Sequence, residues 1–194
     1  FKKAVSSQLL PQTCMKTHYF MMERALDIVN NNSNIKTVIL ASRWGLFTYH
    51  SEVPYVWTKY SEIKDRYQIF EKLFSESIEK LINNGKNVIV VLDNPQLPSD
   101  PKKCIKTRPF LNYRGNCLFK KQDYLSREAR TNEVISKVVK KFDNVQIYNP
   151  ADALCDNKYC YFGKDDNMYY HDDSHLTDFG SKLVAEDFLE KVEL

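Results

Sequence analysis

Asn87-Val88-Ile89-Val90-Val91-Leu92-Asp93 is the stretch from which the fold class can be inferred. Its continuous run of apolar, mostly β-branched residues is typical of a strand that is buried on both faces, as in a parallel sheet covered by helices. Two other runs of the same character, Thr37–Ala41 and Val145–Tyr148, predict further strands. The sequence therefore predicts a sheet of short, buried strands.

Segments with helical periodicity separate these strands. Apolar residues recur at helical spacing from about Ser61 to Asn83, and Asn84-Gly85 then ends the helix, because glycine tolerates the left-handed conformation after a helix. The same spacing predicts helices over 18–30, 123–142 and 176–192. Alternating strands and helices predict a three-layer α/β/α sandwich with a mostly parallel sheet. At 194 residues, the chain is expected to form a single domain over 1–194.

Composition excludes several classes of protein. The net charge is only +3 and the lysines are scattered, so no basic stripe indicates a nucleic-acid partner. No apolar run approaches the roughly 18 residues of a membrane-spanning helix. The chain begins at Phe1 rather than methionine, and we interpret it as a fragment of a longer protein.

The five cysteines predict two local disulfides, Cys155–Cys160 and Cys104–Cys117, and leave Cys14 without a partner. Disulfides in loops indicate an oxidising compartment. The alternative is a zinc site, but the C-x4-C spacing lacks a second pair or nearby histidines, and it is poor for zinc. We therefore expect disulfides, no metal and no cofactor.

A possible catalytic pair lies close to the C-terminus, where Asp172 and His175 precede the last helix. An imidazole that activates a hydroxyl needs a carboxylate to fix its tautomer and to stabilise its protonated form. The alternative is an ordinary helix-capping turn, in which Thr177 is the N-cap and Asp173 and Ser174 are turn residues. Spacing alone does not decide between the two interpretations.

Two other segments leave the carboxyl ends of predicted strands, where ligands bind in parallel sheets. They are Ser42-Arg43-Trp44 and Asp93-Asn94-Pro95. We expect both to face one cleft together with Asp172 and His175.

The segment Tyr170 to Thr177, with Asp172-x-x-His175-Leu176-Thr177, resembles the last block of the SGNH hydrolase superfamily. The closer resemblance is to the SGNH domains attached to membrane acyltransferases of the acyltransferase-three family. The matching motifs in chain order are Ala41-Ser42-Arg43-Trp44, Asp93-Asn94-Pro95 with Cys104, the loop from Cys155 to Cys160, and Tyr170 to Thr177. The resemblance implies a flavodoxin-like SGNH fold in which Asp172 and His175 are catalytic.

One block of the family pattern has no counterpart in the sequence. The family's nucleophile lies in a Gly-Asp-Ser-His segment after the first strand, and no such segment, nor any Gly-x-Ser, occurs here. We interpret the chain as lacking that first strand and its serine. Ser42 follows a strand and could act as a substitute nucleophile, but it matches the oxyanion side of the family pattern, so a serine packed at the strand end is the preferred interpretation.

The resemblance also implies roles for the three residues after the first predicted strand. Ser42, Arg43 and Trp44 replace the family's asparagine block and are expected to serve the oxyanion or the substrate. Arg43 would donate a charged hydrogen bond or hold an acidic sugar, with a surface salt bridge as the alternative. Trp44 would be either a core aromatic residue or a platform on which a sugar stacks.

The function implied by the resemblance is that of an extracytoplasmic O-acyltransferase domain. It would transfer an acyl group, expected to be acetyl, to a surface polysaccharide such as the O-antigen of lipopolysaccharide. A membrane-embedded acyltransferase domain of the same polypeptide would donate the acyl group and tether the domain to the inner membrane, on the periplasmic side. Two alternatives stay open, a carbohydrate esterase with the same triad and a non-catalytic glycan-binding domain.

Overall fold

The computed structural model describes residues 24–49, 60, 62–102, 117–164 and 167–193. The chain divides into two compact units, and the single domain expected over 1–194 stays a prediction. Unit 1 comprises Phe1–Val90 and Thr131–Ile147, and unit 2 comprises Val91–Arg130 and Tyr148–Leu194.

The predicted parallel sheet is present. Its strands are β1 (Thr37–Ala41), β2 (Asn87–Val91) and β4 (Val145–Tyr148), in the order β1-β2-β4. The bonds from Val88 N to Asn144 O and from Leu92 N to Tyr148 O advance in the same direction along both strands, so β2 and β4 are parallel. The centre of β2 is fully buried, as its β-branched run predicts.

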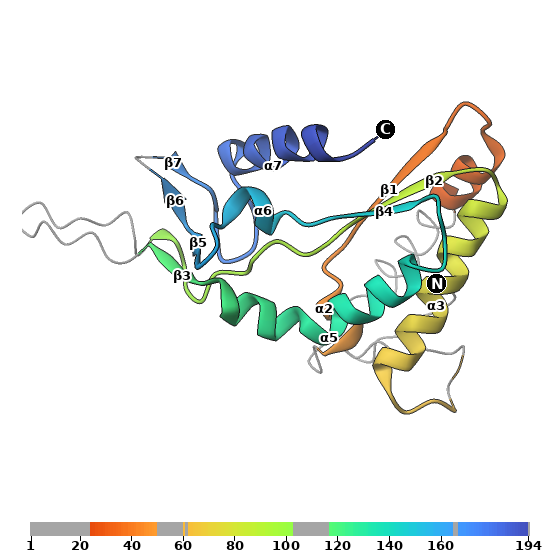
Figure 1. Cartoon of the computed structure of the whole chain (residues 1–194), viewed down its shortest axis with the longest axis horizontal. Coiled ribbons are helices and arrows are strands. Elements are labelled where there is room, and N and C mark those ends of the chain that lie inside the picture. Colours follow the sequence, from red (N-terminus) through yellow and green to blue (C-terminus); the bar gives the residue numbers. More distant parts are fainter. Residues whose placement is uncertain (1–23, 50–59, 61, 103–116, 165–166, 194) are drawn as a thin grey trace, which may run out of the picture. The chain divides into compact units, whose positions relative to one another are not determined.

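The long helices alternate with these strands along the chain (Figure 1). A helix over 24–31 precedes β1, a short helix α2 (Gly45–Thr48) follows it, and α3 (Arg66–Asn83) and α5 (Lys121–Val139) flank β2 in sequence. Helix α3 begins later than predicted because Asp65 caps it, accepting a hydrogen bond from Tyr67 N at 2.9 Å. The mixed α/β fold class predicted from the sequence is confirmed.

Unit 2 contains small elements that the sequence did not predict. Strand β3 (Leu118–Lys120) pairs with β5 (Tyr159–Tyr161), and β6 (Gly163–Lys164) pairs with β7 (Asn167–Met168), both antiparallel. Helix α6 (Ala151–Leu154) is likewise unexpected, whereas α7 (Asp178–Lys191) is the helix predicted over 176–192. They pack around a buried cluster that consists of Leu97, Leu154, Phe162, Tyr169 and Tyr170.

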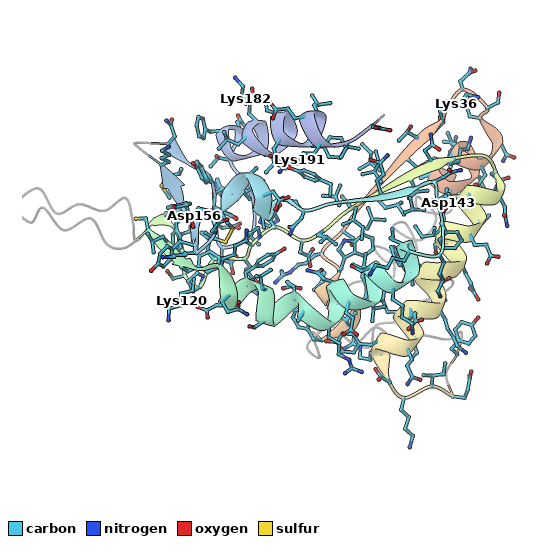
Figure 2. All side chains as sticks on the ribbon, in the orientation of Figure 1. Lys36, Lys120, Asp143, Asp156, Lys182 and Lys191 are labelled. Carbon is cyan, nitrogen blue, oxygen red and sulfur yellow. A yellow bond between two sulfur atoms is a disulfide. The ribbon has the colours of Figure 1, made fainter. Side chains whose placement is uncertain are left out.

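One of the two predicted disulfides is formed. Cys155 and Cys160 are bonded, and Figure 2 shows this sulfur–sulfur bond in yellow near Asp156. Cys117, by contrast, carries a free thiol, so the predicted Cys104–Cys117 bond is absent from this structure. Cys104 and Cys14 lie outside the described residues.

Candidate active site

Asp172 and His175 form a hydrogen-bonded pair in the turn before α7. Asp172 Oδ2 lies 2.8 Å from His175 Nδ1. The second oxygen, Asp172 Oδ1, accepts the backbone N–H groups of Ser174 at 2.9 Å and of His175 at 2.8 Å. One oxygen therefore shapes the turn while the other orients the imidazole, which leaves Nε2 as the nitrogen for proton transfer.

The same contacts keep Asp172 ionised. The pKa of its carboxyl lies well below the usual aspartate range, first because of the hydrogen bond from the His175 backbone N–H, then because of that from Ser174, and then because of the His175 side chain. The pair is open to solvent, since the His175 side chain is 80% exposed and that of Asp172 is 44% exposed. A fixed anion beside an accessible imidazole is the arrangement of a general base.

Backbone bonds close the turn into a small loop. His171 N donates to His175 O at 2.8 Å, Thr177 N donates to Tyr169 O at 2.9 Å, and Tyr170 and Leu176 form a β-bridge. These contacts bring the two ends of the turn together. They fix the backbone from which Asp172 and His175 project.

Thr177 joins this loop to the last helix. Its hydroxyl accepts from Gly180 N at 3.1 Å, as the N-cap of α7, and donates to Met168 O at 2.6 Å. The helix-capping interpretation of this stretch is thus correct for Thr177, and it is compatible with the catalytic interpretation of Asp172 and His175.

The segment that follows β2 contacts the turn, as expected for Asp93-Asn94-Pro95. Tyr170 Oη donates to Pro95 O at 2.8 Å, and burial raises the pKa of this tyrosine. Leu97 N donates to Asp173 O at 2.8 Å, and Gln96 Nε2 donates to Asp173 Oδ2 at 3.0 Å. Within unit 2, therefore, two segments far apart in the sequence form one side of the site.

A hollow of about 280 Å³ lies between these two segments. Its lining residues are Leu97, Pro98, Ser99, Asp100, Asp172 and Asp173. Sequence reasoning identified Asp172 but missed the wall from Leu97 to Asp100, because this irregular loop has no periodicity or motif that reports which way its side chains point.

Ser42, Arg43 and Trp44 belong to unit 1. Ser42 and Arg43 are exposed, so Ser42 is not packed at the strand end as expected. Trp44 is only 4% exposed and packs against Phe70 and Phe74, with ring centroids 6.0 and 5.3 Å apart. Trp44 is therefore a core aromatic residue, while the oxyanion or substrate role of Ser42 and Arg43 stays a prediction.

No group of three or more His, Cys, Asp and Glu side chains that could hold a metal ion occurs within the described ranges. In the same part of the chain, no helix is both long and apolar enough to span a bilayer.

Gly180 in the first turn of α7 gives a test of how tightly the turn is packed. A Cβ there would lie 2.9 Å from the carbonyl carbon of Tyr169 and closer still to its oxygen. We expect Gly180→Ala to destabilise the protein by about 1–3 kcal/mol through overpacking, although alanine favours a helix by about 1 kcal/mol over glycine. The free energy of unfolding, measured in denaturant, checks this.

Ser181→Ala, at the next and exposed position, is the matched control and should leave the free energy of unfolding almost unchanged. A Gly180→Ala protein that is more stable than the parent would contradict the prediction.

Asp172 gives a second test, by its titration. Because the pKa of this carboxyl is lowered in the folded protein, its contribution to stability is present above the unfolded value of about 3.9 and is lost as the pH falls through the folded value. The side-chain carboxyl carbon of Asp172, followed by NMR, should therefore titrate well below pH 3.9. A midpoint near the ordinary value would mean that the backbone hydrogen bonds of the turn do not form.

Comparison with solved structures supports the fold. The chain resembles the periplasmic domain of a lipopolysaccharide acetyltransferase from Salmonella ser. Paratyphi A, with a TM-score of 0.54 and 16% sequence identity, over 88% of this chain. The chain spans 60% of the length of that domain. No curated protein sequence matches the chain.

Comparison with family models identifies the family of the chain. The model described as "SGNH domain (fused to AT3 domains)" matches residues 4–190, which include β1, the segment after β2 and the turn with Asp172 and His175. The chain therefore belongs to the family of SGNH domains that are fused to AT3 domains.

Proposed function

We propose that the chain is the extracytoplasmic domain of an O-acyltransferase that acetylates a surface polysaccharide, such as the O-antigen of lipopolysaccharide. The observation that carries this proposal is the 2.8 Å bond between Asp172 Oδ2 and His175 Nδ1, in a chain of the SGNH family. The similarity to the Salmonella lipopolysaccharide acetyltransferase domain supports the choice of acetyl group and acceptor.

The two residues would act as follows. His175 Nε2 takes the proton of a serine hydroxyl as its oxygen attacks the carbonyl carbon of an acyl donor, and Asp172 stabilises the resulting imidazolium. The leaving group takes a proton from His175, and an acyl-serine remains. His175 then takes the proton of a sugar hydroxyl, which attacks the acyl-serine, and the proton returns to the serine oxygen. The products are the acylated sugar and the original serine.

The serine itself is not assigned to this sequence. The Gly-Asp-Ser-His segment that carries it in the family does not occur among the 194 residues. We propose that this segment lies elsewhere in the polypeptide and meets Asp172 and His175 in the assembled domain.

The family supports a proposal for the partner and the compartment. Its SGNH domains are fused to AT3 domains, and we propose that such a membrane-embedded domain donates the acyl group and tethers this one to the inner membrane. The Cys155–Cys160 disulfide supports a location in an oxidising compartment, the periplasm.

The test uses the chain joined to a segment with the Gly-Asp-Ser-His sequence, which we call the complemented protein. It is given p-nitrophenyl acetate as acyl donor and an O-antigen polysaccharide as acceptor, and acetylated polysaccharide is measured by mass spectrometry. We expect acetylation that disappears in the serine-to-alanine version of the added segment. Absence of ester turnover, or turnover unaffected by that change, would contradict the proposal and favour a non-catalytic glycan-binding domain.

A carbohydrate esterase is the second candidate, because water as well as a sugar can reach an imidazole that is 80% exposed. The same reaction separates the two functions. Free acetate from a pre-acetylated polysaccharide, with no transfer to fresh acceptor, would indicate the esterase.

A further inference from the structure

The hollow of about 280 Å³ beside Asp172 has no part in the proton transfers described above. We call it the side pocket, and its walls are Leu97, Pro98, Ser99 and Asp100 on one side and Asp172 and Asp173 on the other. Its volume is just below the range of about 300–1,000 Å³ typical of pockets for drug-sized ligands. One sugar ring, rather than an extended oligosaccharide, matches this size.

The walls of the side pocket are held together before any ligand binds. Leu97 N is bonded to Asp173 O at 2.8 Å, and Gln96 Nε2 is bonded to Asp173 Oδ2 at 3.0 Å. On the same wall as Leu97, Asp100 Oδ1 accepts the backbone N–H of Lys102 at 2.8 Å. A preformed site loses little conformational entropy on binding, which favours even a small ligand.

The chemistry of the lining restricts the ligand. Asp100, Asp172 and Asp173 are carboxylates, Ser99 is a hydroxyl, and none of the described residues that line the pocket is basic. Carboxylates accept hydrogen bonds from sugar hydroxyls, and they repel a carboxylate or phosphate on the ligand. Leu97 and Pro98 add an apolar surface for the C–H face of a sugar ring.

We infer that the side pocket is the acceptor subsite, that it takes an uncharged sugar ring, and that Asp100 and Asp173 exclude uronic, sialic and phosphorylated sugars. The inference rests on the proposed function, since it names the acceptor class of the same site. Asp172 lines the pocket and orients His175, so a ring held there lies against the residue that positions the general base.

Binding to the chain itself tests this, independently of catalysis. Methyl β-D-glucopyranoside and methyl β-D-glucuronopyranoside have the same ring and differ in a hydroxymethyl against a carboxylate group. Each is titrated into the ¹⁵N-labelled chain at low ionic strength. We expect the glucoside to shift the amide signals of Leu97, Ser99 and Asp173, and to bind at least about fivefold more tightly than the glucuronide. Added salt should reduce the preference for the glucoside, because it weakens the repulsion between the exposed carboxylates and the glucuronide.

The isosteric double variant Asp100→Asn/Asp173→Asn should bind the glucuronide more tightly than the parent chain does. Most of the preference for the glucoside over the glucuronide should therefore disappear. Glu186→Gln/Glu190→Gln removes two charges from exposed positions of α7 and is the matched control, which should keep the preference. Equal binding of the two sugars, no binding of either, shifts confined to other residues, or equal effects of the two double variants would overturn the inference. A complemented protein that acetylates nothing would instead overturn the proposed function.

Discussion

Replacing His175 by alanine is expected to lower acyl transfer by the complemented protein by about 10⁴-fold or more, because in the proposed reaction this imidazole takes the serine proton. The loss should appear in kcat for p-nitrophenyl acetate, with little change in KM, since the imidazole acts on the reacting atoms rather than on binding. The fold should be unaffected, because the His175 side chain is 80% exposed and its backbone bonds do not depend on the ring.

His171→Ala is the matched control for this change. His171 lies in the same turn, is exposed, and is joined to His175 through its backbone N–H, so its side chain can be removed without breaking that bond. We expect transfer within a fewfold of the parent protein. Equal losses in the two variants would show that the turn, and not the imidazole of His175, is what matters.

Asp172→Asn is expected to have the second largest effect, a loss of about 10⁴-fold in kcat, with the backbone of the turn largely kept. The amide oxygen can still accept the N–H groups of Ser174 and His175, which Asp172 Oδ1 accepts now. The amide N–H₂ would then face His175 Nδ1, which would have to become the acceptor. That tautomer carries its proton on Nε2, the nitrogen that must receive the serine proton.

The pH profile distinguishes this explanation from a general loss of structure. At high pH, hydroxide can bypass part of the need for a general base, so the activity of Asp172→Asn should recover relative to the parent as the pH rises. Asp178→Asn, at an exposed position in the first turn of α7, is the control for removal of one charge and should keep the parent profile. A fixed ratio between Asp172→Asn and the parent at every pH would contradict the tautomer argument.

Sequence reasoning succeeded where one local rule decides the outcome. The β-branched run around Ile89 predicted a buried strand, because few other structures bury consecutive apolar residues on both faces. Thr177 was identified as an N-cap from its position before a helical pattern, and the structure confirms it. The Asp172–His175 pair follows from spacing together with the family resemblance.

Sequence reasoning failed where contacts between segments far apart in the sequence determine the structure. The pairing of β3 with β5 joins segments about forty residues apart in the sequence, and neither strand has the length or alternation that would identify it alone. The wall from Leu97 to Asp100 is placed by hydrogen bonds to Asp173, a partner that no local pattern reveals. The thiol of Cys117 is free although its loop position suggested a disulfide, since proximity in sequence does not guarantee the geometry that a bond requires.

The two oxygens of Asp172 have different hydrogen-bond partners, and this has an energetic consequence for the proposed reaction. Because Oδ1 is held by two backbone N–H groups, the carboxylate has little rotational freedom to lose if the imidazolium forms at Oδ2, as proposed. Asp172 Oδ2 already faces the imidazole on which the positive charge would develop, so few dipoles have to reorient on the way to the transition state. In the proposed reaction, part of the reorganisation free energy around this ion pair is thus contributed once, during folding, rather than in every turnover.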